Sequence, residues 1–157
     1  MPWYVIITKP KSEIRTSEIL ENMGVEVFCP VIEEVRQWSD RKKKFIVPLF
    51  RGYIFVKLLD KERSVVFEVS GVLKYLFWLG KPATVHQKEI EVIKEWLCNE
   101  TINNIKVSQF KPGESINIKN GAFKNKKAVI QEISKTKLKL VLPNFGIFLT
   151  ADINELI

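Results

Sequence analysis

The chain has little of the chemistry on which most enzyme and metal sites depend. Its 157 residues include one histidine, His86, and two cysteines, Cys29 and Cys98. Two isolated cysteines form neither a zinc site nor a disulfide framework, so we expect both to be small buried hydrophobic side chains. The sequence contains no nucleophile elbow, Walker loop, metal-binding helix motif or dinucleotide loop. It therefore predicts no enzyme, no metal and no cofactor, and His86 is expected to begin a helix rather than to bind a ligand.

Long apolar runs are also lacking. No segment approaches the roughly 18–20 apolar residues that a membrane helix needs. The first residues, "MPWYVIITKPK", have no basic segment before the apolar run and no small-residue cleavage site, which argues against a signal peptide. With 46% hydrophobic and 27% charged residues, the composition is that of a globular protein of one or two small domains. We expect a cytoplasmic protein that does not bind membranes, and nothing in the sequence demands more than a monomer.

Charge is the informative part of the composition. The chain has 25 basic and 18 acidic residues, a formal net charge of +7. Residues 101–157 contain 9 lysines, no arginine and 4 acidic residues, so this segment holds most of the excess. A basic balance favours nucleic acid or another acidic partner. A solvated lysine face explains the charge equally well.

Hydrophobic patterning predicts an α+β domain in residues 1–99. Residues 3–8 are typical of a strand, and a helix over 12–23 should end at Gly24. We expect a strand over 25–39 that is broken at Pro30, a charged tip at 40–45 and a returning strand over 45–59, so that 31–55 form a long hairpin. Residues 60–69 favour neither helix nor strand, 71–85 favour a strand and a turn, and 86–97 form the clearest helix. The domain should be one antiparallel sheet flanked by helices.

The pattern changes after the last of these helices. Residues 98–109 are polar and rich in asparagine, which suggests a linker. Beyond them, short alternating segments such as "ESINIK", "KAVIQEI", "KLKLVL" and "FGIFLT" are separated by turns, a pattern typical of a small all-β barrel. The predicted organisation is a domain over 1–99, a linker over 100–108 and an all-β domain over 109–157.

Four stretches together resemble a known family. They are "WYVIITKPKSE", "PLFRGYIFV", "GVLKYLFWLGKPATV" and "FKPGESINIKNGAFKNKKAVIQEI". In this order they resemble the NusG family of bacterial transcription factors, with an N-terminal NGN domain and a C-terminal KOW domain that folds as an SH3-like barrel. The pattern at 71–83 is most similar to the specialised paralogs of the UpxY and RfaH type, which act as antiterminators on long operons. For the UpxY proteins these are capsular polysaccharide operons.

The resemblance implies a surface that contacts RNA polymerase. In the family, an apolar depression of the NGN domain binds the clamp helices of the β′ subunit. The matching positions here are Trp3, Tyr4, Ile7, Phe50 and Tyr53. Aromatic side chains supply large contact areas at low entropic cost, but core packing explains the same residues. Simple strand alternation would place Phe50 and Tyr53 on opposite faces, so some of these side chains must be core.

Two groups of cations are expected to bind DNA, the first because of the family resemblance and the second because four cations follow one another in the sequence. The first lies at the junction between the first strand and helix, where family members hold non-template DNA, and comprises Lys9, Lys11 and Arg15. The second lies at the hairpin tip, which would contact upstream duplex DNA through its phosphates, and comprises Arg41, Lys42, Lys43 and Lys44. Ordinary solvated charge is the alternative for both groups.

Two further expectations come from the family. Arg63 and Ser64 match positions that contact the gate loop of the polymerase β subunit. In the KOW segment, Gly121, Phe123 and Asn125 match the motif loop, although Ala stands at two positions that are usually Pro or Gly. The partner of this domain would be a ribosomal protein, Rho or RNA. Its β-rich sequence predicts a stable barrel rather than one that switches to a helical hairpin.

Together these observations predict a transcription antitermination and elongation factor that binds RNA polymerase. One alternative is a housekeeping elongation factor of the same family. Another is an RNA-binding or ribosome-associated KOW module that does not contact the polymerase.

Overall fold

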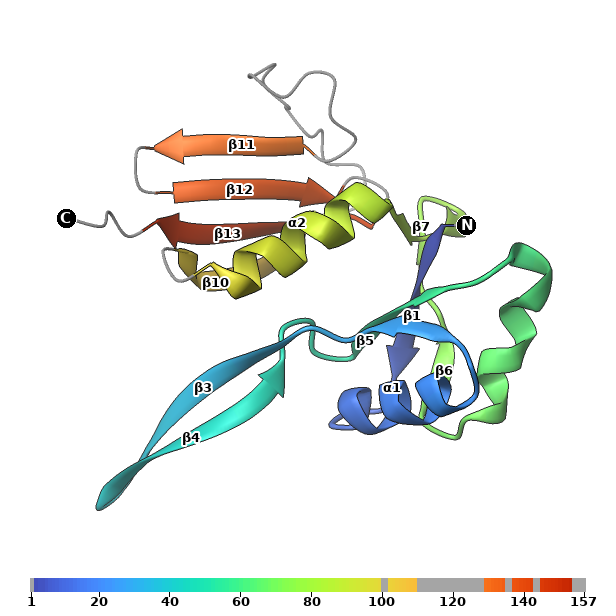
Figure 1. Cartoon of the computed structure of the whole chain (residues 1–157), viewed down its shortest axis with the longest axis horizontal. Coiled ribbons are helices and arrows are strands. Elements are labelled where there is room, and N and C mark those ends of the chain that lie inside the picture. The colour runs from blue at the N-terminus through green and yellow to red at the C-terminus, as the bar shows by residue number, and fades with distance from the viewer. Residues whose placement is uncertain (1, 100–101, 110–128, 135–136, 143–144, 154–157) are drawn as a thin grey trace. The chain divides into compact units, whose positions relative to one another are not determined.

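The computed structural model describes residues 2–99, 102–109, 129–134, 137–142 and 145–153. These residues form an α+β protein in which most of the ordered elements are strands (Figure 1). The chain divides into two compact units, one of residues 6–74 and one of residues 1–5 with 75–157. No helix in the described ranges is both long and apolar enough to cross a membrane.

The first sheet is built around strand β1 (Trp3–Thr8). It has the order β2-β5-β1-β6, and β9 also pairs with β1. The aromatic and β-branched sequence of β1 suits a strand whose two faces are covered, and five of its six side chains are buried. The bounds of its partners are β2 Glu26–Phe28, β5 Tyr53–Lys57, β6 Val72–Tyr75 and β9 Thr84–Val85.

Two helical segments accompany this sheet. Helix α1 (Glu13–Asn22) begins after Ser12 and is followed by Gly24 with a φ of 89°, a conformation that glycine adopts without steric cost. The expected helix over 12–23 is therefore present. Residues 60–69, which favoured neither helix nor strand, contain the 3₁₀ helix η1 (Asp60–Glu68).

The hairpin differs from the prediction. Strand β3 (Val31–Trp38) pairs only with β4 (Arg41–Pro48) within the described residues, and Figure 1 shows the pair as a long two-stranded ribbon. The chain then turns at 49–52, and β5 joins the other sheet. The predicted hairpin over 31–55 is thus too long. Gly52 explains the break, because its φ of 84° is incompatible with a continuous strand.

The other unit contains the clearest predicted helix. Helix α2 (Gln87–Cys98) begins after His86, as the sequence predicts, and buries Ile90, Ile93 and Trp96 along one side. Before it lies a short hairpin of β7 (Phe77–Trp78) and β8 (Lys81–Pro82), where the sequence predicts a turn.

A four-stranded antiparallel sheet in the order β10-β13-β12-β11 follows α2. The all-β prediction for the C-terminal segment agrees with this sheet, whose inward side chains include Leu140, Leu142 and Leu149. The expected linker does not agree, because residues 102–109 form β10 and pair with β13. Its asparagines suggested a loop, but cross-strand pairing outweighs this weak local preference. The strands are β10 Ile102–Gln109, β11 Val129–Ser134, β12 Lys137–Leu142 and β13 Ile147–Ile153.

The cysteines are less buried than expected. Cys29 is half-buried, and burial raises the pKa of its thiol to about 11. Cys98 is exposed, because it is the last residue of α2. The prediction that both are buried is therefore wrong for Cys98.

Replacing Gly71 with alanine should destabilise the protein. A Cβ at Gly71 would collide with Oγ1 of Thr16, a buried residue of α1. We expect Gly71→Ala to lower the free energy of unfolding by about 2 kcal/mol, the usual cost of overpacking. Urea denaturation measures this. Adding Thr16→Ala removes the colliding atom. The double variant should therefore lose less free energy of unfolding than the two single variants lose together. Strict additivity would contradict the collision.

The stability of the protein should depend on the titration of Glu89. This side chain is 2% exposed, its Oε1 accepts a hydrogen bond of 2.9 Å from the amide of His86, and burial raises its pKa from 4.5 to about 7. Between these pKa values the unfolded state loses the proton that the folded state keeps. The free energy of unfolding should therefore fall by up to about 3 kcal/mol as the pH rises from 4.5 to 7.

Glu89→Gln removes this titration and keeps an acceptor for the His86 amide. Urea denaturation at a series of pH values should show a smaller fall for this variant than for the wild type. Parallel curves for the two proteins would show that Glu89 does not titrate between these values.

Candidate nucleic-acid interface

The aromatic residues predicted to contact a partner are mostly in the core. Trp3, Tyr4 and Phe50 are buried, whereas Ile7 and Tyr53 are half-buried. The indole Nε1 of Trp3 donates a hydrogen bond of 2.7 Å to Oε1 of Gln87. Of these five positions, only Ile7 and Tyr53 therefore offer part of their surface in this structure. They lie on neighbouring strands, β1 and β5.

The "PLFRGY" stretch contains the turn at 49–52, which changes which side chains share a face. The amide of Thr8 donates to the carbonyl of Gly52 at 2.9 Å, and Phe50 stands edge-to-face on Phe55, with ring centres 5.0 Å apart. Phe50 and Phe55 therefore contact one another, although strand alternation would have separated them. Arg51 is exposed on the turn.

The cations at the junction of β1 and α1 are accessible. Lys9, Lys11 and Arg15 are all exposed. The amide of Lys9 donates to the carbonyl of Gly71 at 2.9 Å, which holds this junction against the chain that enters β6. Lys11 has a φ of 60°, a left-handed conformation that a lysine adopts only at some cost. The three charges thus lie along the end of β1, the turn that follows it and the first turn of α1.

The cations of the hairpin lie on a strand rather than on a turn. Arg41, Lys42, Lys43 and Lys44 are the first residues of β4, and only Ser39 and Asp40 form the turn. All four are exposed. Because side chains alternate along a strand, Lys42 and Lys44 share one face and the other two share the opposite face. Lys44 is 3.5 Å from Oε1 of Glu33.

Of the remaining predicted positions, the structure describes the two gate-loop candidates but not the three residues of the KOW motif loop. Arg63 is half-buried on η1, with its Nε 3.0 Å from Oδ1 of Asp60, and Ser64 is exposed. The motif-loop residues Gly121, Phe123 and Asn125 lie outside the described residues.

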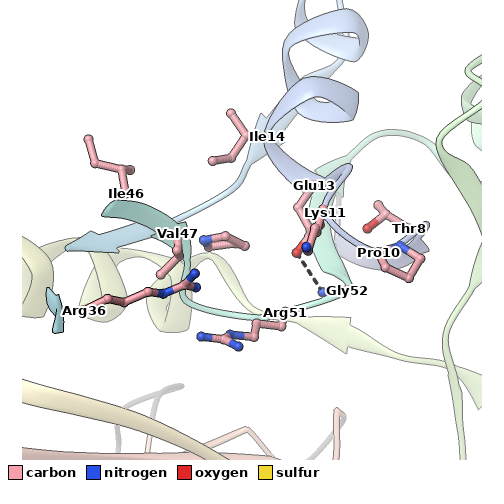
Figure 2. A pocket seen from close by; sticks show the side chains of 11 residues that line it. Thr8, Pro10, Lys11, Glu13, Ile14, Arg36, Ile46, Val47, Arg51 and Gly52 are labelled. Atoms are coloured by element: carbon pink, nitrogen blue, oxygen red, sulfur yellow. Dashed lines mark hydrogen bonds between the residues drawn. The ribbon is translucent and has the colours of Figure 1, made fainter. Parts of the chain in front are cut away.

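A cavity of about 600 Å³ lies beside the first group of cations (Figure 2). Its lining comes from the β1–α1 junction, the base of the β3–β4 hairpin and the turn before β5. Lys11 is the one predicted site residue that lines it. The lining residues are Thr8, Pro10, Lys11, Glu13, Ile14, Arg36, Ile46, Val47, Pro48, Arg51 and Gly52.

Sequence reasoning missed the carboxylate of this cavity. Glu13 is 5% exposed, and its Oε2 accepts a hydrogen bond of 3.2 Å from the amide of Gly52, drawn as a dashed line in Figure 2. In the sequence, a glutamate in the first turn of a helix is ordinary. Nothing in the sequence indicates its burial, because Gly52 is 39 positions away.

Two arginines at the edge of the cavity share one carboxylate. Nε of Arg36 is 3.0 Å from Oε1 of Glu34, and a terminal nitrogen of Arg51 is 2.7 Å from Oε2. The hydrogen bond from Arg36 is the main reason that the pKa of Glu34 is lowered. Because one carboxylate meets two guanidinium groups, this corner keeps a net positive charge. This corner is therefore suited to binding an anion. The described ranges contain no cluster of potential metal ligands.

Comparison with known proteins identifies the family. The family model described as "Transcription termination factor nusG" matches residues 1–94. The chain belongs to the NusG family. The "Transcription termination/antitermination protein NusG" of Campylobacter jejuni is 30% identical over 159 residues, covering 92% of this chain and 88% of the relative. The protein of the same name from Staphylococcus carnosus is 31% identical over 155 residues, covering 89% and 84%.

A solved structure is similar along most of the NusG-family chain. It is described as "Domain interaction in Thermotoga maritima NusG" and is 23% identical. The match covers 98% of this chain and 93% of that chain, with a TM-score of 0.43.

Proposed function

We propose that this NusG-family protein is a transcription elongation and antitermination factor that binds bacterial RNA polymerase at the clamp helices of the β′ subunit. It would act without catalysis, by favouring the closed clamp and so opposing pausing and termination. Such a shift in populations needs only tighter binding to the elongating state. The observation that carries the proposal is the family match over residues 1–94, the part of the chain that holds both the aromatic positions and the cationic groups.

Ile7 and Tyr53 are the polymerase-contacting residues in this proposal. They are the members of the predicted set that keep exposed surface. Trp3, Tyr4 and Phe50 would act from beneath, by fixing the backbone on which these two are displayed. A half-buried tyrosine on a rigid strand is a typical binding hot spot, because little side-chain entropy is lost on binding.

The cationic groups would hold DNA within the same complex. Lys9, Lys11 and Arg15 would follow the non-template strand, and the cations of β4 would contact upstream duplex DNA. The proposal is supported by their exposure. The contact of Arg63 and Ser64 with the β gate loop, and binding of the C-terminal domain to a ribosomal protein, Rho or RNA, extend the proposal from the family resemblance alone.

Two ranges of target genes are compatible with this function. A specialised role on a few long operons, such as those for capsular polysaccharide, is suggested by the pattern at 71–83. A general role at most genes is favoured by the names of the relatives, which are NusG itself. Sequencing the DNA that co-purifies with the cross-linked protein separates the two roles. DNA from a few operons would indicate the specialised role, and DNA from most transcribed genes would indicate the general role.

Binding to a bacterial elongation complex, assembled on a nucleic-acid scaffold, tests the proposal. Tyr53→Ser should weaken binding at least about tenfold, the size of effect expected of a hot spot. The matched control is Leu73→Ser, which removes an exposed apolar side chain from a different strand and should bind as the wild type does. Failure of the wild-type protein to bind, or wild-type affinity of a folded Tyr53→Ser protein, would overturn it.

A further inference from the structure

The outer edge of β3 has no partner strand among the described residues. In this part of the chain β3 pairs with β4 alone, and the two form a ribbon of two strands (Figure 1). Such a ribbon is only marginally stable in water, and its edges carry backbone groups with which another strand can pair. On one face of the ribbon, Val31, Val35 and Ile46 are 40%, 56% and 68% exposed. The ribbon is therefore suited to gaining another strand.

The register of the ribbon shows which backbone groups point away from β4. The amide of Leu49 donates to the carbonyl of Pro30 at 2.8 Å, and these residues stand opposite one another when the register of β3 and β4 is extended by one pair. Hydrogen-bonded and non-hydrogen-bonded pairs alternate along an antiparallel ladder. The outward N–H and C=O groups of β3 therefore belong to Val31, Glu33, Val35 and Gln37.

The two edges of the ribbon differ in their protection against pairing. By the same register, the outward backbone groups of β4 belong to Lys42, Lys44, Ile46 and Pro48. Lysine and proline are typical of edge strands that avoid pairing, because lysine is charged and proline has no N–H group. The outward positions of β3 include neither residue type. An added strand should therefore pair with β3 and not with β4.

The sequence of β3 is complementary to a second copy of itself. If two β3 strands pair antiparallel about a twofold axis through Val35, each Glu34 lies opposite Arg36 of the other copy. These pairs are of the non-hydrogen-bonded kind, in which opposite side chains come closest, and opposite charges in such pairs stabilise a sheet. An axis one residue earlier or later would place Glu34 opposite Glu34, or Arg36 opposite Arg36. The charges therefore favour the axis through Val35.

We propose that the protein forms a dimer in which the β3 strands of two copies pair in this register, giving a four-stranded sheet in the order β4-β3-β3-β4. The pairing adds about six backbone hydrogen bonds and brings the exposed Val35 side chains of the two copies together. The cations at the start of β4 stay on the outer edges of this sheet, where they remain accessible to DNA. The dimer goes beyond the proposed function, because neither the polymerase nor DNA takes part in it.

The carboxylates that take part are already restricted within each copy. Glu34 meets Nε of Arg36 in its own strand at 3.0 Å and a terminal nitrogen of Arg51 at 2.7 Å, and none of the three side chains is buried. In the dimer the two Glu34 and two Arg36 side chains alternate on one face. Because the ion pairs within each copy restrict Glu34 before association, less side-chain entropy is lost when the second copy binds.

Sedimentation velocity of the full-length protein over a range of concentrations tests the dimer. An interface of one strand pair is smaller than the standard size, so we expect a dissociation constant of about 10–100 μM. Val35→Lys places like charges on the twofold axis and should raise this constant at least about tenfold. Ile46→Lys is the matched control, because it adds the same charge at an exposed apolar position on β4. It should dimerise as the wild type does.

A charge exchange tests the register. Glu34→Arg and Arg36→Glu each place like charges opposite one another, and each should weaken the dimer about tenfold. The double variant Glu34→Arg/Arg36→Glu restores opposite charges and should dimerise within about threefold of the wild type. Circular dichroism shows whether each variant is folded. If Val35→Lys does not fold, this exchange decides the proposal.

Cross-linking locates the interface. Residues opposite one another in a hydrogen-bonded pair have Cα atoms about 5.5 Å apart, a separation that a disulfide can span. In a protein that also carries Cys29→Ser and Cys98→Ser, Val35→Cys should form a covalent dimer under mild oxidation. Ile46→Cys should not, because the two β4 strands lie on opposite edges of the proposed sheet.

Several results would overturn the proposal. They are a wild-type protein that stays monomeric up to about 500 μM, an unchanged dissociation constant in folded Val35→Lys, and a double charge variant that dimerises no better than the single variants. A monomer would mean that the edge of β3 is left to water or to a strand of another protein. Binding to the elongation complex is measured separately, so the dimer and the proposed function can fail independently.

Discussion

Replacing Arg41, Lys42, Lys43 and Lys44 with serine should weaken binding to duplex DNA about a hundredfold at low salt. All four side chains are exposed on β4, and Glu33 is the one carboxylate near them in a described ion pair, with Lys44. Each cation that contacts a phosphate releases a counterion. The slope of log K against log salt should therefore become shallower by about 3. Titration of a labelled duplex at several salt concentrations measures both quantities.

The control for this prediction removes the same charge from elsewhere. Lys61, Lys74, Lys88 and Lys94 are also exposed, and their replacement with serine changes the net charge by the same amount. If only total charge matters, the two variants should lose affinity equally. We expect the control to retain most of the wild-type affinity and slope. Equal losses would show that the ribbon is an ordinary solvated surface.

The position of these cations on a strand changes what they can contact. On a turn, four consecutive charges would point in several directions. On β4 they alternate between two faces of a narrow ribbon, opposite Val35, Arg36, Gln37 and Trp38 of β3. Each face thus carries two of the four cations. Two double variants separate the faces: one replaces Lys42 and Lys44 with serine, and the other replaces Arg41 and Lys43 with serine. The variant that loses more affinity for duplex DNA identifies the face that contacts it.

Phe50→Ala should remove about 3–5 kcal/mol from the free energy of unfolding, the usual cost of truncating a buried phenylalanine. Phe50 is 1% exposed, and its ring stands at 86° to that of Phe55 with 5.0 Å between centres. Such edge-to-face pairs add to the energy of burial. Because domains of this size are stable by only about 5–15 kcal/mol, the variant should be close to unfolding. Urea denaturation followed by circular dichroism measures the change.

Phe67→Ala is the matched control for Phe50. Phe67 is 54% exposed on η1, so its truncation should change the free energy of unfolding by at most about 0.5 kcal/mol. The alternative role for Phe50 is contact with the polymerase. A Phe50→Ala protein of wild-type stability that no longer binds the elongation complex would show that this ring is a contact residue and not core.

The two phenylalanines also show where a local pattern stops being informative. Alternation along a continuous strand would separate Phe50 from Phe55. The chain turns between them, so their rings meet in the core. The turn includes Gly52, whose positive φ depends on where β5 joins the sheet beside β1.

Patterns within short segments determined much of this protein. The strand at 3–8, helix α1, the break at Pro30, helix α2 and its start after His86 follow from side-chain periodicity and from glycine and proline. The four quoted stretches carried the family, which the match over residues 1–94 confirms. These features depend on neighbours in the chain, and so they are visible in the sequence.

Tertiary structure alone decided the features that depend on distant residues. Residues 102–109 are a strand because β13 supplies partners for their backbone, although their composition favours a loop. Glu13 is buried in the folded chain, where it accepts a hydrogen bond from the amide of Gly52, 39 positions away. The cavity combines residues from separate segments between Thr8 and Gly52. Burial and hydrogen-bond partners across such separations are properties of packing, which no local pattern of residues specifies.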